Sequence, residues 1–213
     1  MVKLSVEEGT FLVKLARKAV KEYLENARII QPPPDTPEKL FEKAGVFVTI
    51  EEIFVDPILR RARRELRGCI GYPEPFFPMV EATIRSAIAA ATEDPRFPPM
   101  TPKELDRVVF EVSILTKPQE LKYTSPEELP EKIKIGRDGL IIEQGIARGL
   151  LLPQVAVDEK WGPEEFLSYA CLKAGLREDE WRKGRVKVYV FQSQIFVEAT
   201  PEGEVVERLL EAV

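Results

Sequence analysis

The order of the hydrophobic segments is the feature that most limits the fold of this chain. Alternating apolar residues predict strands in "GVFVTIE" (45–51), "ELRGCIGY" (65–72) and "RVVFEVSIL" (107–115), and helical spacing predicts a helix over 78–92. Consecutive strands with short connections pair as antiparallel neighbours rather than as parallel βαβ units. We therefore expect an α+β fold with a mainly antiparallel sheet and flanking helices.

A second series of segments repeats this order of strand, strand, helix and strand. Its members are a predicted hairpin around 136–139 in "KIKIGRDGLIIEQ", a strand leaving into a loop in "ARGLLLPQVAV" (147–157), a helix in "GPEEFLSYACLKAG" (162–175), and a long strand or bent strand pair in "RVKVYVFQSQIFVE" (185–198). The repeated order suggests an internal duplication within one domain, 1–213, with subdomains or repeats at about 40–118 and 130–200. Chance recurrence is the alternative, because α+β chains often show this order.

Helical signals also stand outside the two series. Residues 5–26 have apolar residues at helical spacing, and Ser5 with Glu8 forms a capping-box pattern. A short helix is expected to start at Thr36, after the stiff connector "QPPPD". The last ten residues are expected to form a short amphipathic helix or a frayed tail.

The composition excludes several kinds of chemistry. The 213 residues include no histidine and two cysteines, with a net charge of −5. This removes His-dependent catalytic pairs, a disulfide framework and a typical zinc site. There is no GxGxxG, P-loop or CxxC motif. Any catalysis must use Cys, Lys, Tyr, Asp or Glu, or a cofactor that the sequence leaves unknown, and no metal site is expected.

Two further properties bear on where the protein works. No apolar run approaches the roughly 20 residues of a membrane span, and the N-terminus has no signal-peptide core, so we expect a cytoplasmic protein. The 18 prolines and abundant Glu, Lys and Arg are typical of a thermophile.

The segment "LRGCIGYPEP" (66–75) is the strongest candidate for a functional site. If it starts as a strand, Arg67, Cys69 and Gly71 share one face, because alternate side chains point to the same side. The Arg67 guanidinium can then reach the Cys69 thiol and lower its pKa. Gly68 and Gly71 would let a ligand approach the backbone closely.

Three interpretations of Cys69 stay open. It is a catalytic thiol, a non-catalytic part of a cleft wall, or a small packed side chain like most free cysteines. Leu66 and Ile70, on the opposite face of the strand, are expected in the core. Cys171 lies at helical spacing with apolar neighbours and is expected to be a core residue.

The loop "EDPRFPP" (93–99) follows a predicted helix and holds charged side chains between prolines. Loops of this kind often carry functional residues. Asp94 is the nearest available general base for Cys69, and Arg96 is a candidate ligand contact. The simpler interpretation is a helix stop with a local Asp–Arg contact.

Three other features have a functional and a structural interpretation. Glu111 and Ser113 either line the same cavity or belong to a half-exposed strand. Gln154 either points into a cleft or is a loop amide bonded to nearby backbone. The run "RRARR" (60–64) either binds anions or nucleic acid or is a solvated charged loop, which the negative net charge and the absence of interleaved aromatic residues favour.

Taken together, these stretches resemble the AMMECR-one family. The resemblance rests on "LRGCIGYPEP", "DPRFPP" with "FEVSIL", "GRDGLIIEQG", and "GLLLPQVAVDEKW" with "FLSYACLKAGL", which span about 45–197. It implies a single α+β unit with two subdomains and a cleft, no assigned activity, and possible partners among Memo-like and radical-SAM proteins. The family's signature hexapeptide maps onto Leu66 to Gly71 without departure.

Three functions follow as hypotheses. The first is an enzyme, or an enzyme partner, that acts on a small molecule or a modified peptide. In it Cys69 is the nucleophile or redox thiol and Asp94 is the base. The cleft is lined by ligand-binding residues, which are Arg67, Gly68, Gly71, Arg96 and Gln154. The alternative is a non-catalytic module that binds a protein or ligand, and a weaker alternative is nucleic-acid binding through the arginine run.

Overall fold

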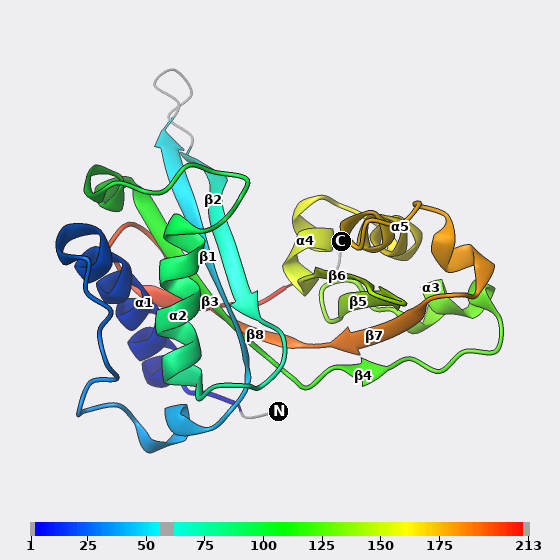
Figure 1. Ribbon diagram of the computed structural model, residues 1–213, viewed down its shortest axis with the longest axis horizontal. Coiled ribbons are helices and arrows are strands. Elements are labelled where there is room, and N and C mark those ends of the chain that lie inside the picture. Colours follow the sequence, from blue (N-terminus) through cyan, green and yellow to red (C-terminus); the bar gives the residue numbers. More distant parts are fainter. Residues whose placement is uncertain (1–2, 56–61, 211–213) are drawn as a thin grey trace. The chain divides into compact units, whose positions relative to one another are not determined.

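The structure is a computed structural model that describes residues 3–55 and 62–210 (Figure 1). It has the predicted α+β fold, with two antiparallel sheets and several helices. The chain divides into two compact units: unit 1 is Met1–Leu115 with Gln194–Arg208, and unit 2 is Thr116–Ser193 with Leu209–Val213. No helix in the described part of the chain is long and apolar enough to cross a membrane.

Unit 1 is built on a five-stranded sheet with the order β2-β1-β3-β8-β9. Its strands are β1 (Gly45–Val55), β2 (Ala62–Tyr72), β3 (Val108–Leu115), β8 (Ser193–Glu198) and β9 (Val205–Arg208). The helix or frayed tail predicted at the C-terminus is wrong for 205–208, which pair with β8 as an edge strand. Strand β2 starts three residues earlier than predicted.

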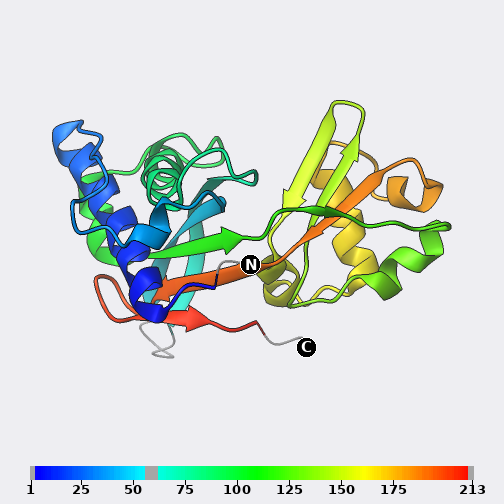
Figure 2. The same cartoon turned by 90° about the horizontal axis from the view of Figure 1, so that it is seen from below.

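Helices α1 (Val6–Asn26) and α2 (Met79–Thr92) cover one face of this sheet (Figures 1 and 2). The predicted capping box of α1 is present, because Ser5 and Glu8 exchange side chain–backbone hydrogen bonds. Apolar residues of both helices and of β1, β2 and β3 form one core. Two 3₁₀ helices complete the unit, η1 (Glu38–Phe41) and η2 (Pro102–Arg107). The helix predicted from Thr36 is therefore shorter than expected.

Unit 2 is built on a four-stranded sheet with the order β4-β7-β5-β6. Its strands are β4 (Gln119–Glu120), β5 (Gly139–Gln144), β6 (Ala147–Leu151) and β7 (Lys187–Phe191). Its helices are η3 (Pro126–Glu128), α3 (Leu129–Lys132), α4 (Pro153–Asp158), α5 (Pro163–Lys173) and η4 (Glu180–Lys183). Helix α5 packs against β5 and β6, and Cys171 lies fully buried in this core, as predicted.

Two sequence predictions in unit 2 are wrong in detail. The hairpin expected around 136–139 is a tight turn after α3, with Gly136 at φ 79°, and the hairpin of the unit joins β5 to β6 through Gly145. A glycine with positive φ suits either turn, so the sequence could not distinguish them. For the segment 185–198, a long strand and a bent strand pair were the two alternatives. The structure shows two strands, β7 and β8, which belong to different sheets.

Candidate functional site

Cys69 lies on β2, the edge strand of the unit 1 sheet. It pairs with Thr49 of β1, and Thr49 pairs in turn with Glu111 of β3. Paired residues of antiparallel strands point to the same side of a sheet, so the three side chains form a row across three strands. Their alternating neighbours Val48 and Ile50 belong to the core under α1 and α2, which places the row on the opposite face.

A hydrogen bond joins two members of the row, and an ion pair holds the third. The Thr49 hydroxyl donates to Cys69 Sγ at 3.3 Å. At the other end, Arg208 Nη1 of β9 donates to Glu111 Oε2 at 3.1 Å. Glu111 is 2 % exposed and Ser113 is also buried, so the half-exposed strand considered for these two residues is wrong. Sequence reasoning missed Thr49 and Arg208, because only the strand register and the position of β9 bring them here.

Asp94 and Arg96 lie beside Cys69, in the loop that follows α2. Asp94 Oδ2 accepts a hydrogen bond from the Cys69 backbone N–H at 2.9 Å. The Arg96 guanidinium donates to both Asp94 oxygens, from Nε at 2.9 Å and Nη2 at 2.7 Å. An edge strand leaves alternate N–H groups without a strand partner, and Asp94 takes the place of one such partner.

These contacts make Asp94 a poor general base. Hydrogen bonds from Arg96 lower the pKa of the Asp94 carboxyl to about 2, with a further contribution from the Cys69 N–H and against the cost of burial. A carboxylate with so low a pKa accepts a proton weakly near neutral pH. Asp94 therefore positions Arg96 and the Cys69 backbone.

Arg67 does not activate the thiol. Its Nε donates to Glu104 Oε1 at 2.8 Å and its Nη2 to the Pro98 carbonyl at 2.8 Å, while its guanidinium lies 5.8 Å from the centre of the Phe97 ring. Arg67 thus fastens the 94–98 loop to β2. Burial raises the pKa of the Cys69 thiol, although the Thr49 hydrogen bond and the Arg96 charge act in the opposite direction. The predicted lowering of this pKa by Arg67 is wrong.

The two glycines of the motif are explained by packing inside unit 1. A Cβ on Gly68 would collide with the carbonyl oxygen of Ala90, on the helix α2 that crosses the strand. A Cβ on Gly71 would collide with the ring of Phe47 and the Val46 carbonyl. The space that was expected to admit a ligand at these glycines is filled by the protein itself.

A bulge in the strand register changes the faces expected for the motif. Ile50 pairs with Gly68 but Glu51 pairs with Leu66, so Arg67 is the extra residue. Leu66 is consequently 41 % exposed, and its predicted place in the core is wrong. Ile70 packs against the core as predicted.

The remaining candidates belong to other elements of the chain. Gln154 is buried in the first turn of α4 in unit 2, not in a loop, and the cleft predicted from residues of both units stays a prediction. Arg63 and Arg64 lie in β2 rather than in a loop and pair with Glu65 and Glu51, while Arg60 and Arg61 fall outside the described residues. Among the described residues, no three Cys, Asp or Glu side chains could together hold a metal ion.

Comparisons with known proteins identify relatives along almost the whole chain. A protein of Thermofilum pendens is 76 % identical over 213 residues, which is 100 % of both chains. A protein of Thermococcus kodakarensis is 54 % identical over 96 % of this chain and 97 % of its own length. The crystal structure of an uncharacterized protein from Pyrococcus horikoshii superimposes with a TM-score of 0.91, at 52 % identity, over 97 % of this chain and 99 % of that one.

The family itself follows from a match to a family model. The AMMECR1 model matches residues 13–196, which include the whole "LRGCIG" motif and all strands except β9 and the last two residues of β8. This is the family that the sequence motifs resemble, and the chain belongs to the AMMECR1 family.

Proposed function

We propose that this protein acts on a small molecule or a modified peptide at a site on unit 1, with the Cys69 thiol as the reactive group. The observation that carries the proposal is the polar row of Cys69, Thr49 and Glu111. Burying polar side chains costs free energy, and apolar residues would stabilise a sheet of this size better. A role in ligand binding or chemistry accounts for polar residues in these three positions.

Glu111 is the proton acceptor in this proposal. A chain without histidine has to use another base, and hydrogen bonds from Arg96 lower the pKa of Asp94 to about 2. Glu111 is itself paired with Arg208, so in this proposal it acts as a base when the ligand draws Arg208 away.

Glu111 lies two strands from Cys69 with the Thr49 hydroxyl between them. In the resting structure that hydroxyl donates to Cys69 Sγ. For the transfer, the hydroxyl turns toward Glu111, so that the thiol proton moves from Sγ to Thr49 Oγ1 while the hydroxyl proton moves to the Glu111 carboxylate.

A non-catalytic binding module is the second candidate. The raised pKa of Cys69 favours it, because a thiol that stays protonated near neutral pH is a weak nucleophile. In this version the thiol and the Thr49 hydroxyl only line the site, and Arg96 is the main ligand contact.

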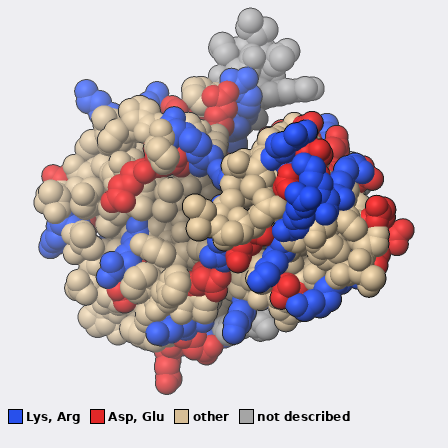
Figure 3. Space-filling model, turned by 45° about the vertical axis from the view of Figure 1, so that its right-hand side comes forward, with Lys and Arg blue, Asp and Glu red and all other residues tan. Residues whose placement is uncertain are grey.

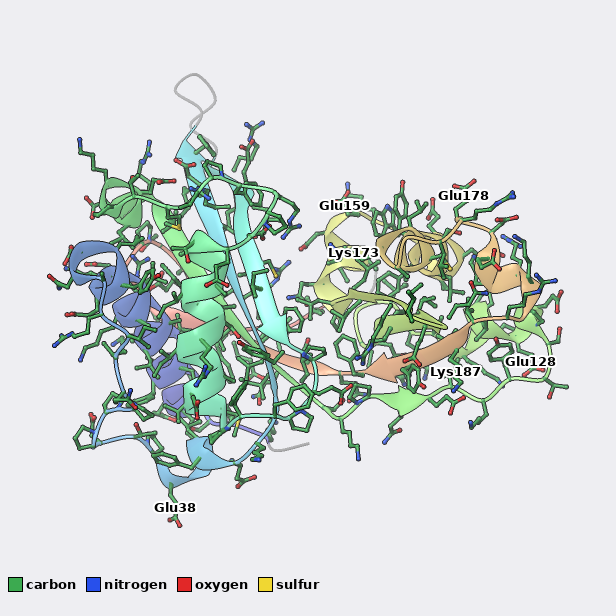
Figure 4. The ribbon with its side chains drawn as sticks, viewed as in Figure 1. Glu38, Glu128, Glu159, Lys173, Glu178 and Lys187 are labelled. Atoms are coloured by element: carbon green, nitrogen blue, oxygen red, sulfur yellow. The ribbon has the colours of Figure 1, made fainter. Side chains whose placement is uncertain are left out.

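Nucleic-acid binding through the arginine run has less support. The described arginines of the run pair with glutamates. On the face drawn in Figure 3, basic and acidic side chains lie beside one another, whereas nucleic-acid sites carry an excess of basic groups. Figure 4 labels charged side chains of both signs, namely Glu38, Glu128, Glu159, Lys173, Glu178 and Lys187.

The experiment that tests the proposal compares the wild-type protein with Cys69→Ser and with Cys171→Ala, a control that removes the other thiol. Each is incubated with the small-molecule and peptide fraction of an archaeal extract, and mass spectrometry follows species that are bound or converted. Conversion by the wild-type and control proteins but not by Cys69→Ser supports the reactive thiol. Equal conversion by Cys69→Ser contradicts it, and stoichiometric retention without conversion by all three proteins favours the binding module.

A further inference from the structure

Both oxygens of the Asp94 carboxylate orient Arg96, and one of them also binds the Cys69 backbone. Oδ1 accepts hydrogen bonds from the Arg96 backbone N–H at 3.1 Å and from Nε at 2.9 Å, and Oδ2 accepts one from Nη2 at 2.7 Å. Asp94 is itself buried, so the pair is anchored in the protein rather than mobile at its surface. This bidentate geometry fixes the plane of the guanidinium and the direction of its outer edge.

The oriented guanidinium lies close to the backbone of Cys69. Asp94 Oδ2 accepts from both Arg96 Nη2 and the Cys69 backbone N–H, so these two nitrogens lie within two hydrogen-bond lengths of each other. The charge of Arg96 accordingly lowers the pKa of the Cys69 thiol, against the larger effect of burial.

Arg96 keeps one side of its guanidinium available. Its side chain is 44 % exposed, whereas the Asp94 side chain that holds it is buried. In the described part of the chain, no hydrogen bond joins Arg96 Nη1 to another residue. The guanidinium also lies 5.5 Å from the centre of the Phe97 ring, which supports it from one face.

Arg67 of β2 binds the same loop and contrasts with Arg96. Its side chain is buried, and its Nε and Nη2 donate to Glu104 and to the Pro98 carbonyl, while its buried Nη1 has no hydrogen-bond partner among the described residues. Arg96 instead presents an exposed, preoriented edge, the geometry with which arginine binds carboxylates and phosphates.

The carboxylates nearby do not exclude an anion. Asp94 is paired with Arg96, and Glu111 is paired with Arg208 at 3.1 Å. Each negative charge is therefore matched by a fixed positive one, and an arriving anion meets the N–H edge of Arg96 first.

We propose that Arg96 anchors an anionic group, a carboxylate or a phosphate, on the ligand that Cys69 acts upon. This inference rests on the proposed function of Cys69 and adds the class of ligand: a small acid, or a peptide that ends in or carries an acidic group. Asp94 is the positioning residue that holds the anchor beside the thiol.

Two alkylating reagents of nearly equal size and opposite character test the proposal. Iodoacetate carries a carboxylate and iodoacetamide is neutral. In both reactions the bond from Cys69 Sγ to carbon forms, the carbon–iodine bond breaks, iodide leaves, and the thiol proton passes to the buffer. Mass spectrometry measures the rate at each cysteine of the folded protein, and 2-mercaptoethanol gives the reference ratio of the two rates.

We expect the iodoacetate-to-iodoacetamide rate ratio at Cys69 to exceed the reference by about ten-fold, the effect of one charge-assisted hydrogen bond. Arg96→Gln should return the ratio to the reference. Arg85→Gln is the matched control, because Arg85 is a similarly exposed arginine of unit 1 that pairs with Glu81, and it should leave the ratio unchanged.

Competition by simple anions identifies the group that is bound. Protection of Cys69 from iodoacetate by acetate at lower concentration than by inorganic phosphate assigns a carboxylate, and the reverse order assigns a phosphate. Reaction of native Cys69 with both reagents at the reference ratio overturns the anchor and leaves the thiol site standing. Reaction with neither reagent until the protein unfolds overturns both proposals.

Discussion

The two units share a three-stranded arrangement with the same register. In unit 1 the strand order β2-β1-β3 brings Gly68, Ile50 and Phe110 into one row. In unit 2 the order β6-β5-β7 brings Gly149, Ile142 and Val188 into one row. In each unit a helix between the second and third strands of the series packs on the sheet: α2 packs on β1 and β2 in unit 1, and α5, which follows the short helix α4, packs on β5 and β6 in unit 2.

The glycine of each row has the same packing role. A Cβ on Gly68 would overlap the Ala90 carbonyl of α2, and a Cβ on Gly149 would overlap the backbone of Ala174 at the end of α5. Both glycines follow an arginine in the sequence. We propose, from this shared register and packing, that the two units arose by internal duplication.

The next row separates the units chemically. Unit 1 has Cys69, Thr49 and Glu111 in this row. The corresponding positions in unit 2 hold Leu150, Ile141 and Tyr189, which are two aliphatic residues and one aromatic residue without an ionised group. The glycine row is thus common to both units, whereas the polar row occurs in unit 1 and not at the corresponding positions of unit 2, and this difference supports our proposal of a functional site in unit 1.

The largest expected effect concerns a buried ion pair of unit 1. Arg17 of α1 donates hydrogen bonds to the Glu198 carboxylate of β8 and to the carbonyl oxygens of Leu105 and Val108. Glu198 also accepts a hydrogen bond from the Phe110 N–H. Glu198→Ala leaves Arg17 buried without its counter-charge and should destabilise unit 1 by about 3–5 kcal/mol. Hydrogen exchange measured by mass spectrometry should show loss of protection in α1 and β3 first.

The matched variant for this test removes both charges. Arg17→Met with Glu198→Leu should recover much of the lost stability, since a buried pair and apolar residues of similar volume are often comparable. Equal loss of protection in both units after Glu198→Ala would show that the units do not unfold separately, which would weaken their comparison.

The next effect tests the shared glycine row directly. Gly68→Ala and Gly149→Ala should each cost about 1–3 kcal/mol, because the added methyl group forces a helix away from its sheet. Exchange protection should fall in α2 for the first variant and in α5 for the second. Gly162→Ala is the control, since its Cβ would meet only the end of the Glu165 side chain. A neutral Gly149→Ala would break the proposed equivalence of the two glycines.

Sequence periodicity predicted these shared elements because each is a long apolar pattern with its own local signal. It could not predict features that depend on register. The bulge at Arg67 moved Leu66 out of the core, and the pairing of β1 brought Thr49 to Cys69. Strand β9 is too short to carry a pattern, so the contact of Arg208 with Glu111 was also beyond sequence reasoning.

The sequence identified Cys69 and the 93–99 loop as candidate parts of a site, but it did not reveal the roles of the residues around Cys69. The sequence predicts Asp94 and Arg96 in the same site as Cys69, and in the structure both residues lie beside it. Arg67 and Glu104 are 37 positions apart, so the partner that occupies Arg67 could be found only from the folded chain.

The smallest expected effect concerns the row that distinguishes the units. The negative charge of Glu111 raises the pKa of the Cys69 thiol, in addition to the effect of burial. Glu111→Gln should therefore lower that pKa, leave more thiolate near pH 8, and increase alkylation by iodoacetamide about three-fold, which corresponds to half a pKa unit. The pH profile of the rate should shift to lower pH, and the rates should converge where the thiol is fully ionised in both proteins. Glu51→Gln on the same face, whose partner is Arg64, is the control and should leave the profile in place. An unchanged pH profile in Glu111→Gln would mean that the charge of Glu111 does not act on the Cys69 thiol. Unit 1 would then differ from unit 2 in composition rather than in function.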